Sequence, residues 1–211
     1  MSMLRKDISI FLNSIPKGVT LVAATKYISS TEMLELYDNG IKNYGENRTE
    51  AFLNKYSYLS NYKDITWHFI GHLQRNKAKD IINKIDYLHS LDSLKLADII
   101  EKERSTPLKT FVEVSINLEE NKNGVPYYEV KDFVKELLKY KKIELVGFMM
   151  MAIKSSLNAQ EQFHKLKILK EDIERELNIK IPYLSMGMSD DYKEAIKEGA
   201  THIRLGRILY E

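Results

Sequence analysis

Short, mostly apolar runs alternate with segments of helical periodicity along almost the whole chain. The runs are five to nine residues long and rich in β-branched and aromatic side chains, which is typical of buried strands. They lie at 20–25, 41–45, 65–71, 86–90, 110–116, 143–151, 181–187 and 200–206. The remaining segments predict helices at 3–14, 30–39, up to about 59, 74–84, 93–104, 127–140, 157–177 and 189–198.

Strict alternation of strand and helix favours an α/β fold with a parallel sheet. Eight such units predict a closed (β/α)8 TIM barrel, a fold whose shortest members have roughly 200 residues, and this chain has 211. An open, doubly wound sheet is the alternative. No linker-like stretch interrupts the pattern, so we expect residues 1–211 to form a single domain. No helix has room after residue 206, and an extra N-terminal helix is therefore expected to cover the gap beside the eighth strand.

The composition excludes several classes of function. The 32 basic and 30 acidic side chains give a net charge of +2 without a basic cluster, so we expect no nucleic-acid partner. Cysteine is absent, which excludes disulfides and thiolate metal sites. No apolar run reaches the roughly 20 residues that span a membrane, and the N-terminus lacks the apolar core of a signal peptide. We therefore expect a cytoplasmic protein without a membrane partner, and a monomer because no extra domain or apolar arm is visible.

The first predicted strand ends in Ala-Ala-Thr-Lys-Tyr at residues 23–27. Ligands of α/β proteins bind at the carboxyl ends of parallel strands, which places Lys26 on the ligand-facing rim. An apolar wall beside its amine would favour the neutral, nucleophilic form that imine chemistry requires. On position alone, a lysine that snorkels from a strand end into solvent is the more common explanation. The residues after Lys26 support a helix, because Ser29 and Glu32 have the spacing of a capping box.

The seventh and eighth strands end in small residues that favour an anion. The loop Gly187-Met188-Ser189 leads into the last predicted helix, with Ser189 as its N-cap, and free amides at a helix N-terminus attract phosphate. The eighth strand adds Gly206 and Arg207, and the loops after these two strands often form a phosphate site in this barrel. A plain turn with a capping serine is the alternative, and the carboxylates at 190–191 can themselves satisfy the helix dipole. A lysine that forms an imine and a phosphate site across the rim together describe pyridoxal 5'-phosphate.

Several spaced motifs occur in a recognisable order. They are Ala-Thr-Lys at 24–26, Tyr-Gly-Glu-Asn at 44–47, Trp-His-Phe-Ile-Gly-His-Leu-Gln-Arg-Asn-Lys at 67–77, Lys-Asn-Gly at 122–124, Gly-Phe-Met at 147–149, Leu-Ser-Met-Gly-Met-Ser-Asp-Asp at 184–191 and Ile-Arg-Leu-Gly-Arg at 203–207. With these motifs the sequence resembles the YggS/PROSC family of pyridoxal-phosphate homeostasis proteins. That family is related in fold to the barrel domain of alanine racemase. The resemblance covers nearly the whole chain from about Leu21.

The resemblance implies roles for individual residues. It implies that Lys26 holds pyridoxal 5'-phosphate as an aldimine and that Asn47 lies beside the cofactor. It implies a phosphate site made by the loop at Met188 together with Ser189, Gly206 and Arg207. It also implies that Arg204 faces the pyridine nitrogen. The sequence departs from the usual pattern of this family at Arg75, Met150 and Ile153, and none of these is a position assigned to the cofactor.

Arg204 argues against strong catalysis. Arginine only donates hydrogen bonds, so opposite the pyridine nitrogen it favours the unprotonated ring, which is a poor electron sink. We therefore expect a carrier that buffers pyridoxal phosphate and passes it to apo-enzymes, with no catalytic residue of its own. A weak amino-acid racemase that binds amino acids is the alternative, since alanine racemase also has an arginine there. A barrel that serves only as a protein-interaction module is a third class, and it would need no Lys26.

Two other signals are interpreted structurally. His68 and His72 have the spacing of one strand face, but no third metal ligand is evident, so we predict no metal site. The methionines at 149–151 are interpreted as packing in the core and near the cofactor.

Overall fold

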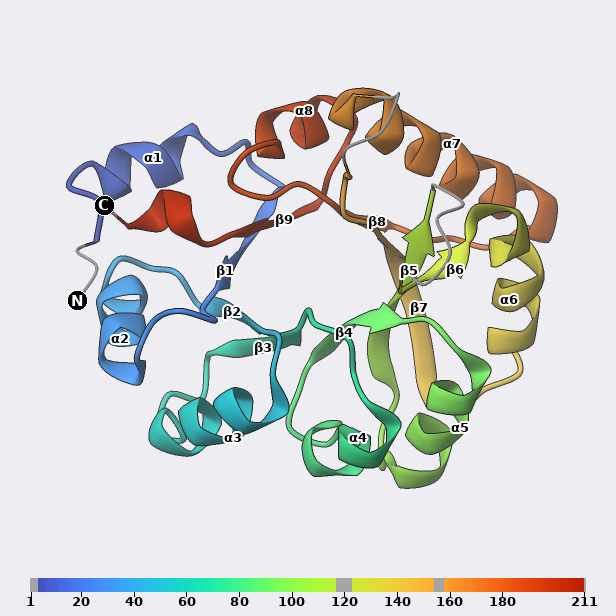
Figure 1. Cartoon of the computed structure of the whole chain (residues 1–211), viewed down its shortest axis with the longest axis horizontal. Helices are drawn as coiled ribbons and strands as arrows, with labels where there is room; N and C mark the ends of the chain where they lie inside the picture. The colour runs from blue at the N-terminus through green and yellow to red at the C-terminus, as the bar shows by residue number, and fades with distance from the viewer. Residues whose placement is uncertain (1–3, 117–122, 154–157, 211) are drawn as a thin grey trace.

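Eight parallel strands close into a barrel in the part of the chain that this computed structural model describes, residues 4–116, 123–153 and 158–210 (Figure 1). In order around the barrel they are β1 Thr20–Ala24, β2 Asn43–Glu46, β3 Thr66–Phe69, β4 Tyr87–Leu91, β5 Leu108–Ser115, β7 Ile143–Met149, β8 Tyr183–Ser185 and β9 His202–Leu205. Two pairings close the ring, β4 with β5 and β1 with β9, the latter with Val22 opposite Arg204. The barrel is therefore confirmed, and the open sheet is wrong because it would leave these edges unpaired.

Helices follow the barrel strands and surround them (Figure 1). They are α2 Ser30–Asp38, α3 Thr49–Tyr58, α4 Arg75–Ile81, α5 Leu94–Glu103, α6 Val130–Leu137, α7 Ala159–Leu177 and α8 Tyr192–Lys197. The predicted capping box is present at α2, where the Ser29 hydroxyl accepts the Glu32 amide and the Glu32 carboxylate accepts the Ser29 amide. It satisfies amides that a helix start otherwise leaves without partners.

The N-terminal helix is shorter than predicted but lies where expected. It spans α1 Ile8–Ser14, followed by Pro16. The segment before it joins the end of the chain: Leu4 bridges Tyr210, and the Arg5 amide donates to the Leu209 carbonyl at 3.1 Å. That end forms a short 3-10 turn, η2 Arg207–Leu209, directly after β9. The N-terminal segment thus lies against the end of the chain that follows β9, and Phe11 of α1 packs on Tyr192 of α8, with ring centroids 6.0 Å apart.

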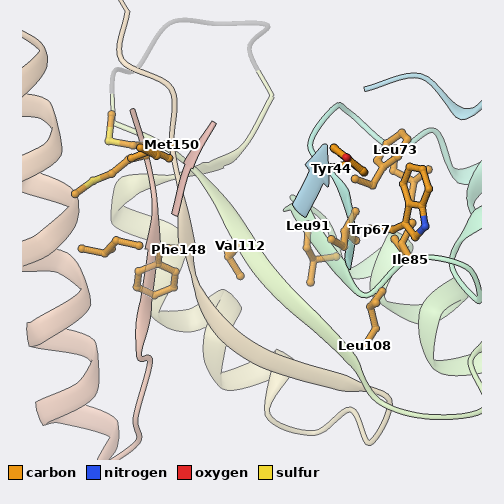
Figure 2. Packing of buried hydrophobic residues seen from close by; sticks show 14 of the residues in the cluster. Tyr44, Trp67, Leu73, Ile85, Leu91, Leu108, Val112, Phe148 and Met150 are labelled. Atoms are coloured by element: carbon orange, nitrogen blue, oxygen red, sulfur yellow. The ribbon is translucent and has the colours of Figure 1, made fainter. Parts of the chain in front are cut away.

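The main core lies between the barrel and its helices. Figure 2 shows Tyr44, Trp67 and Leu73 together on one side and Phe148 near Met150 on the other. Inside the barrel, the packing is aromatic and polar instead, because several inward positions carry rings. These are His68, Tyr87, His89, Phe111, Tyr183 and His202, whose centroids lie 4.3–6.4 Å from their neighbours.

Several predicted boundaries differ from the structure. The predicted helix at 127–140 is a 3-10 turn, η1 Tyr127–Glu129, followed by α6, and a short unpredicted strand, β6 Val125–Pro126, pairs with β5 outside the barrel. The helix predicted from 157 starts at Ala159 because Asn158 caps it. Residues 117–122, which include Lys122 of the Lys-Asn-Gly motif, and residues 154–157 lie outside the described residues. No helix among the described residues is long and apolar enough to cross a membrane.

Candidate functional site

The ends of β1 and β9 meet at the carboxyl-terminal mouth of the barrel. Gly206 follows β9 so closely against β1 that a Cβ there would lie 3.3 Å from the Ala24 carbonyl oxygen. Ser189 joins the same place, because its hydroxyl accepts the Gly206 amide at 3.3 Å and the Ile208 amide at 3.4 Å. The structure therefore brings the loop after β8 and the loop after β9 beside the strand that leads to Lys26.

Lys26 itself lies in an exposed turn after β1. The turn is closed by the Ile28 amide, which donates to the Thr25 carbonyl at 3.1 Å. The Lys26 Nζ lies 4.7 Å from the centre of the Tyr27 ring, which is itself 79% exposed. The expected apolar wall is not found: the strand stops at Ala24, one residue earlier than predicted, and the amine emerges beside a solvent-exposed aromatic ring. An amine placed there is accessible to a ligand that enters the mouth.

The strand end under Lys26 is anchored by a buried ion pair that the sequence analysis did not identify. Lys55 of α3 donates from Nζ to Glu46 Oε1 at 2.5 Å and to the Thr25 carbonyl at 2.6 Å. The Thr25 hydroxyl donates to the same Glu46 oxygen at 2.5 Å. All three side chains are buried, and Glu46 Oε2 is enclosed without a hydrogen-bond partner among the described residues. The cluster holds the residue just before Lys26 in place through both its backbone and its side chain.

The N–H donors predicted to bind phosphate lie in neighbouring loops, but their local structure differs from the prediction. Ser189 does not cap the last helix: α8 begins at Tyr192, with Asp191 before it. Asp191 accepts the Met188 amide at 2.6 Å, as a carboxylate at this turn can. Arg207, which is exposed, donates to Asp190 at 2.6 Å. Each of these N–H donors thus has an oxygen acceptor within the chain, which a phosphate oxygen would have to replace.

Two glycines shape this part of the mouth. Gly187 has φ +92°, and a Cβ there would lie 2.6 Å from Cβ of Ala195, so only glycine fits the turn that carries Met188 and Ser189. A Cβ at Gly71 would lie 2.3 Å from the Asn47 carbonyl oxygen, so the loop after β3 packs directly on Asn47. Asn47, half-buried at the end of β2, therefore lies at the mouth next to the strand that leads to Lys26.

Arg204 points from β9 into the barrel and is only 4% exposed. It donates from Nη1 to the Ser185 hydroxyl at 2.6 Å and from Nη2 to the Met150 carbonyl at 2.9 Å. Burial lowers the pKa of Arg204 to about 10, opposed by the carboxylates of Glu113 and Asp191, so it is charged at neutral pH. Two of its five N–H groups are hydrogen-bonded within the described residues, which leaves donors for a ligand.

Glu113 is a mouth residue that the sequence analysis missed. It alternates along β5 with Phe111, which lies among the interior rings, so it also points into the barrel. Burial raises its pKa to about 7, with a further contribution from Asp92, while Arg204 opposes the shift. In an eight-stranded ring β5 is opposite β1, so this carboxyl faces the Lys26 side across the mouth. A charged residue inside the apolar run at 110–116 was the available signal.

The two histidines lie in different surroundings, and two of the three methionines pack in the core. His68 is buried and hydrogen-bonded inside the barrel, whereas the half-exposed ring of His72 lies on the rim, 3.2 Å from Asp92. No group of three histidine, aspartate or glutamate side chains among the described residues is arranged to hold a metal ion. Met149 and Met150 are buried, but Met151 is 47% exposed because the strand has ended.

The residues at the mouth fit a phosphorylated aldehyde. An accessible amine, a set of N–H donors already engaged by oxygen acceptors, and a buried guanidinium with free donor capacity lie at the ends of adjacent strands. These are the groups that such a ligand needs for its carbonyl carbon, its phosphate and a ring acceptor.

Comparison with known proteins gives a consistent result. The family model "Alanine racemase, N-terminal domain" matches residues 5–211. A pyridoxal phosphate homeostasis protein from Aquifex aeolicus is 37% identical over 195 residues, which cover 90% of this chain and 85% of that protein. The human pyridoxal phosphate homeostasis protein is 32% identical over 206 residues, covering 90% of this chain and 75% of that protein.

Solved structures agree with the sequence relatives. PipY from Synechococcus elongatus, with pyridoxal phosphate bound, superimposes with a TM-score of 0.88 at 28% identity, covering 97% of this chain and 100% of that one. An alanine racemase from Clostridium difficile superimposes with a TM-score of 0.75 at 18% identity, covering 99% of this chain but 57% of that one. The second likeness shows the shared barrel fold alone.

Proposed function

The chain belongs to the pyridoxal phosphate homeostasis proteins of the alanine racemase N-terminal domain family, and we propose on this premise that it binds pyridoxal 5'-phosphate through Lys26 as a carrier. The observation that carries the proposal is the meeting of Lys26, the loop at Ser189 and Gly206 at adjacent strand ends. Bound pyridoxal phosphate supplies an aldehyde that reacts reversibly with primary amines. Lys26 would hold that end, and Met188, Ser189, Gly206 and Arg207 would hold the phosphate.

Arg204 makes this protein a carrier more than a catalyst. Its guanidinium would donate a hydrogen bond to the ring nitrogen of the bound ligand, and it stays charged even with the lowered pKa of about 10. A ring nitrogen that accepts from arginine is not protonated, so the ring withdraws electrons weakly. Asn47, at the end of β2, would lie beside the ring. The exposed amine of Lys26 in turn allows the ligand to leave for an apo-enzyme.

The test is an absorbance spectrum of the purified protein with added pyridoxal phosphate. We expect a band near the visible edge that borohydride abolishes, with the reduced label on the peptide that contains Lys26. Lys26→Ala should lack the band. Lys17→Ala is the matched control, because Lys17 is exposed in the turn before β1 at the opposite end of the barrel. A band of equal strength in Lys26→Ala would overturn the proposal.

A weak amino-acid racemase is the second candidate, and Glu113 favours it. Racemisation needs a proton donor and a proton acceptor on opposite sides of the reacting carbon, and Glu113 faces the Lys26 side with a pKa of about 7. The measurement is exchange of the α-proton of alanine or serine in D₂O by the loaded protein. Exchange that Glu113→Gln abolishes would support the racemase, and absence of exchange would leave the carrier alone.

The proposal extends to surroundings and assembly. We propose a cytoplasmic monomer that transfers its ligand to apo-enzymes, since these enzymes are the acceptors that a carrier serves.

A further inference from the structure

A line of hydrogen bonds crosses the barrel interior from Arg204 to the start of β2. The Arg204 guanidinium lies 2.6 Å from the Ser185 hydroxyl, which lies 2.8 Å from Nδ1 of His89. Nε2 of His89 lies 2.9 Å from Nδ1 of His68, and Nε2 of His68 lies 3.0 Å from Oδ1 of Asn43. The residues come from β9, β8, β4, β3 and β2, so the line links five strands.

The two histidines in the line are neutral. Both are completely buried, and burial holds the pKa of His68 and of His89 well below the usual range. Electrostatic interactions with His68, His202 and Arg204 lower the pKa of His89 in the same direction. A neutral imidazole has one donor nitrogen and one acceptor nitrogen, so each ring must accept on one side and donate on the other.

Both ends of the line require the same direction. Asn43 Oδ1 only accepts, so His68 donates from Nε2 and accepts at Nδ1. His89 must then donate from Nε2 and accept at Nδ1, which the Ser185 hydroxyl satisfies by donating. Arginine only donates, and the Ser185 oxygen is left free to accept from it. The donor and acceptor roles deduced from Asn43 therefore leave an acceptor oxygen next to Arg204, as a group that only donates requires.

The line restricts how Arg204 can be held. Because the Ser185 proton is committed to His89, the Ser185 oxygen is an oriented acceptor at Nη1, and the Met150 carbonyl is the acceptor at Nη2. These two acceptors, on β8 and directly after β7, fix the plane of the guanidinium. Its remaining donors are then directed by the protein and not by solvent.

We propose that Ser185, His89 and His68 are positioning residues that orient the Arg204 guanidinium toward the ring of the bound ligand. This rests on the proposed function. It assigns a role to interior residues that need not touch the ligand. The simpler explanation is that the rings only fill the barrel, where His89 stacks on Phe111 at 4.3 Å and His68 on Tyr87 at 4.6 Å. Filling alone requires neither a fixed tautomer nor the Ser185 hydroxyl.

The first test is the tautomer of each histidine, measured by ¹⁵N NMR on the histidine-labelled protein without added pyridoxal phosphate. We expect His68 and His89 to carry the proton on Nε2 at neutral pH. A proton on Nδ1 of either ring would reverse the line and overturn the proposal. This measurement does not depend on ligand binding. Failure of the proposed function would be seen separately, as the absence of the Lys26-dependent band in the unmodified protein.

The second test removes the acceptor next to Arg204. In Ser185→Ala we expect the Lys26-dependent band to form, because Lys26 is intact, but with a shifted maximum. We also expect pyridoxal phosphate to dissociate about tenfold faster, the effect of one lost hydrogen bond to a charged group. Ser185→Thr keeps the hydroxyl and should restore both readouts. Ser90→Ala is the matched control, since Ser90 is also buried and its hydroxyl donates to the Gly71 carbonyl, at 2.6 Å, and not to Arg204.

Two outcomes would count against the positioning role. If Ser185→Ala and the unmodified protein share the same band maximum and dissociation rate, the hydroxyl does not orient Arg204. If Ser90→Ala shifts them equally, the effect comes from losing any buried serine. Should Ser185→Ala fail to fold, the Thr variant carries the test through the His89 ¹⁵N shifts, which must match those of the unmodified protein.

Discussion

The two ends of the candidate site are built in opposite ways. Lys26 is exposed in a turn, with its amine 4.7 Å from the centre of the exposed Tyr27 ring. Arg204 is buried and held by oriented acceptors from two neighbouring strands. A reactive group that is accessible can exchange its ligand, whereas a recognition group that is fixed selects the ligand without moving. For a carrier this division is useful, because release and selection are assigned to different residues.

The largest expected effect comes from breaking the support under Lys26. Lys55→Met leaves Glu46 buried and charged without its cation, which should lower the free energy of unfolding by about 3–5 kcal/mol. Urea denaturation followed by circular dichroism measures the change. Lys26 itself is unchanged in this variant. A loss of stability would therefore show that the ion pair beneath Lys26, and not the lysine, supports this strand end.

Two further variants sharpen the test of that support. The double variant Glu46→Gln/Lys55→Met removes both charges and should recover part of the lost stability. Lys131→Met breaks an exposed pair with Glu176 and should have no resolvable effect. Equal losses in Lys55→Met and Lys131→Met would contradict the assigned role of the buried pair.

The next effect concerns the interior beneath Arg204. Burial, with a contribution from Arg204, lowers the pKa of His202 to about 4, and the pKa values of His68 and His89 are also depressed. The folded protein therefore binds fewer protons than the unfolded chain below pH about 6.5, so acid favours unfolding. The contribution of these histidines to stability is fully present above pH about 6.5 and is lost toward pH 4. His202 alone contributes about 3 kcal/mol of it.

Denaturation midpoints measured between pH 4 and 7.5 check this dependence. His202→Phe should flatten the pH dependence of stability, because a phenyl ring does not bind a proton in either the folded or the unfolded state. The flattening should be confined to the acidic side of the profile. An unchanged slope in that variant would mean that His202 is not the buried neutral group that the structure describes.

The smallest expected effect has the opposite sign. The pKa of Glu113 is raised to about 7, so the folded protein binds more protons than the unfolded chain between pH about 4.5 and 7. Raising the pH through this window therefore destabilises the protein. Glu113→Gln should stabilise the protein at pH 8 relative to pH 4.5 by up to about 3 kcal/mol.

Thermal unfolding of both proteins at the two pH values gives the comparison, and the shared histidine contribution cancels between them. A gain of equal size at both pH values would show that packing, not ionisation, is responsible. A carboxyl kept at the mouth despite such destabilisation is typical of a functional site, because sites retain groups that folding alone disfavours.

The barrel could be predicted from the sequence because its evidence is local. Each strand is a short apolar run and each helix has its own period, so the order of elements follows without knowledge of contacts. The closure of β4 on β5 then follows from the number of units. Strand ends, and with them the candidate positions at Lys26, Ser189 and Gly206, come from the same local pattern. The conformation of the loops does not, which is why the predicted cap at Ser189 is wrong.

The support of the site could not be predicted because it depends on side chains that meet only in the folded protein. Lys55 occupies a helix, where a lysine is normally solvated, and only the approach of α3 to β2 gives it Glu46 as a partner. His89 and Ser185 are 96 residues apart in sequence. Their distance of 2.8 Å is a result of barrel closure. His89 belongs to none of the spaced motifs, and Ser185, although it lies within the motif at 184–191, cannot be paired with His89 from that motif.

The pairing of β1 with β9 also sets when the site can first exist during synthesis. β1 leads to Lys26, and its partner along one edge, His202–Leu205, is made at the other end of the barrel sequence. Contacts between such distant segments form late in folding. A growing chain that ends before residue 202 contains Lys26 but neither Arg204 nor the Gly206 amide. We therefore expect the ribosome to release a chain whose lysine becomes selective for its ligand only when the ring is closed.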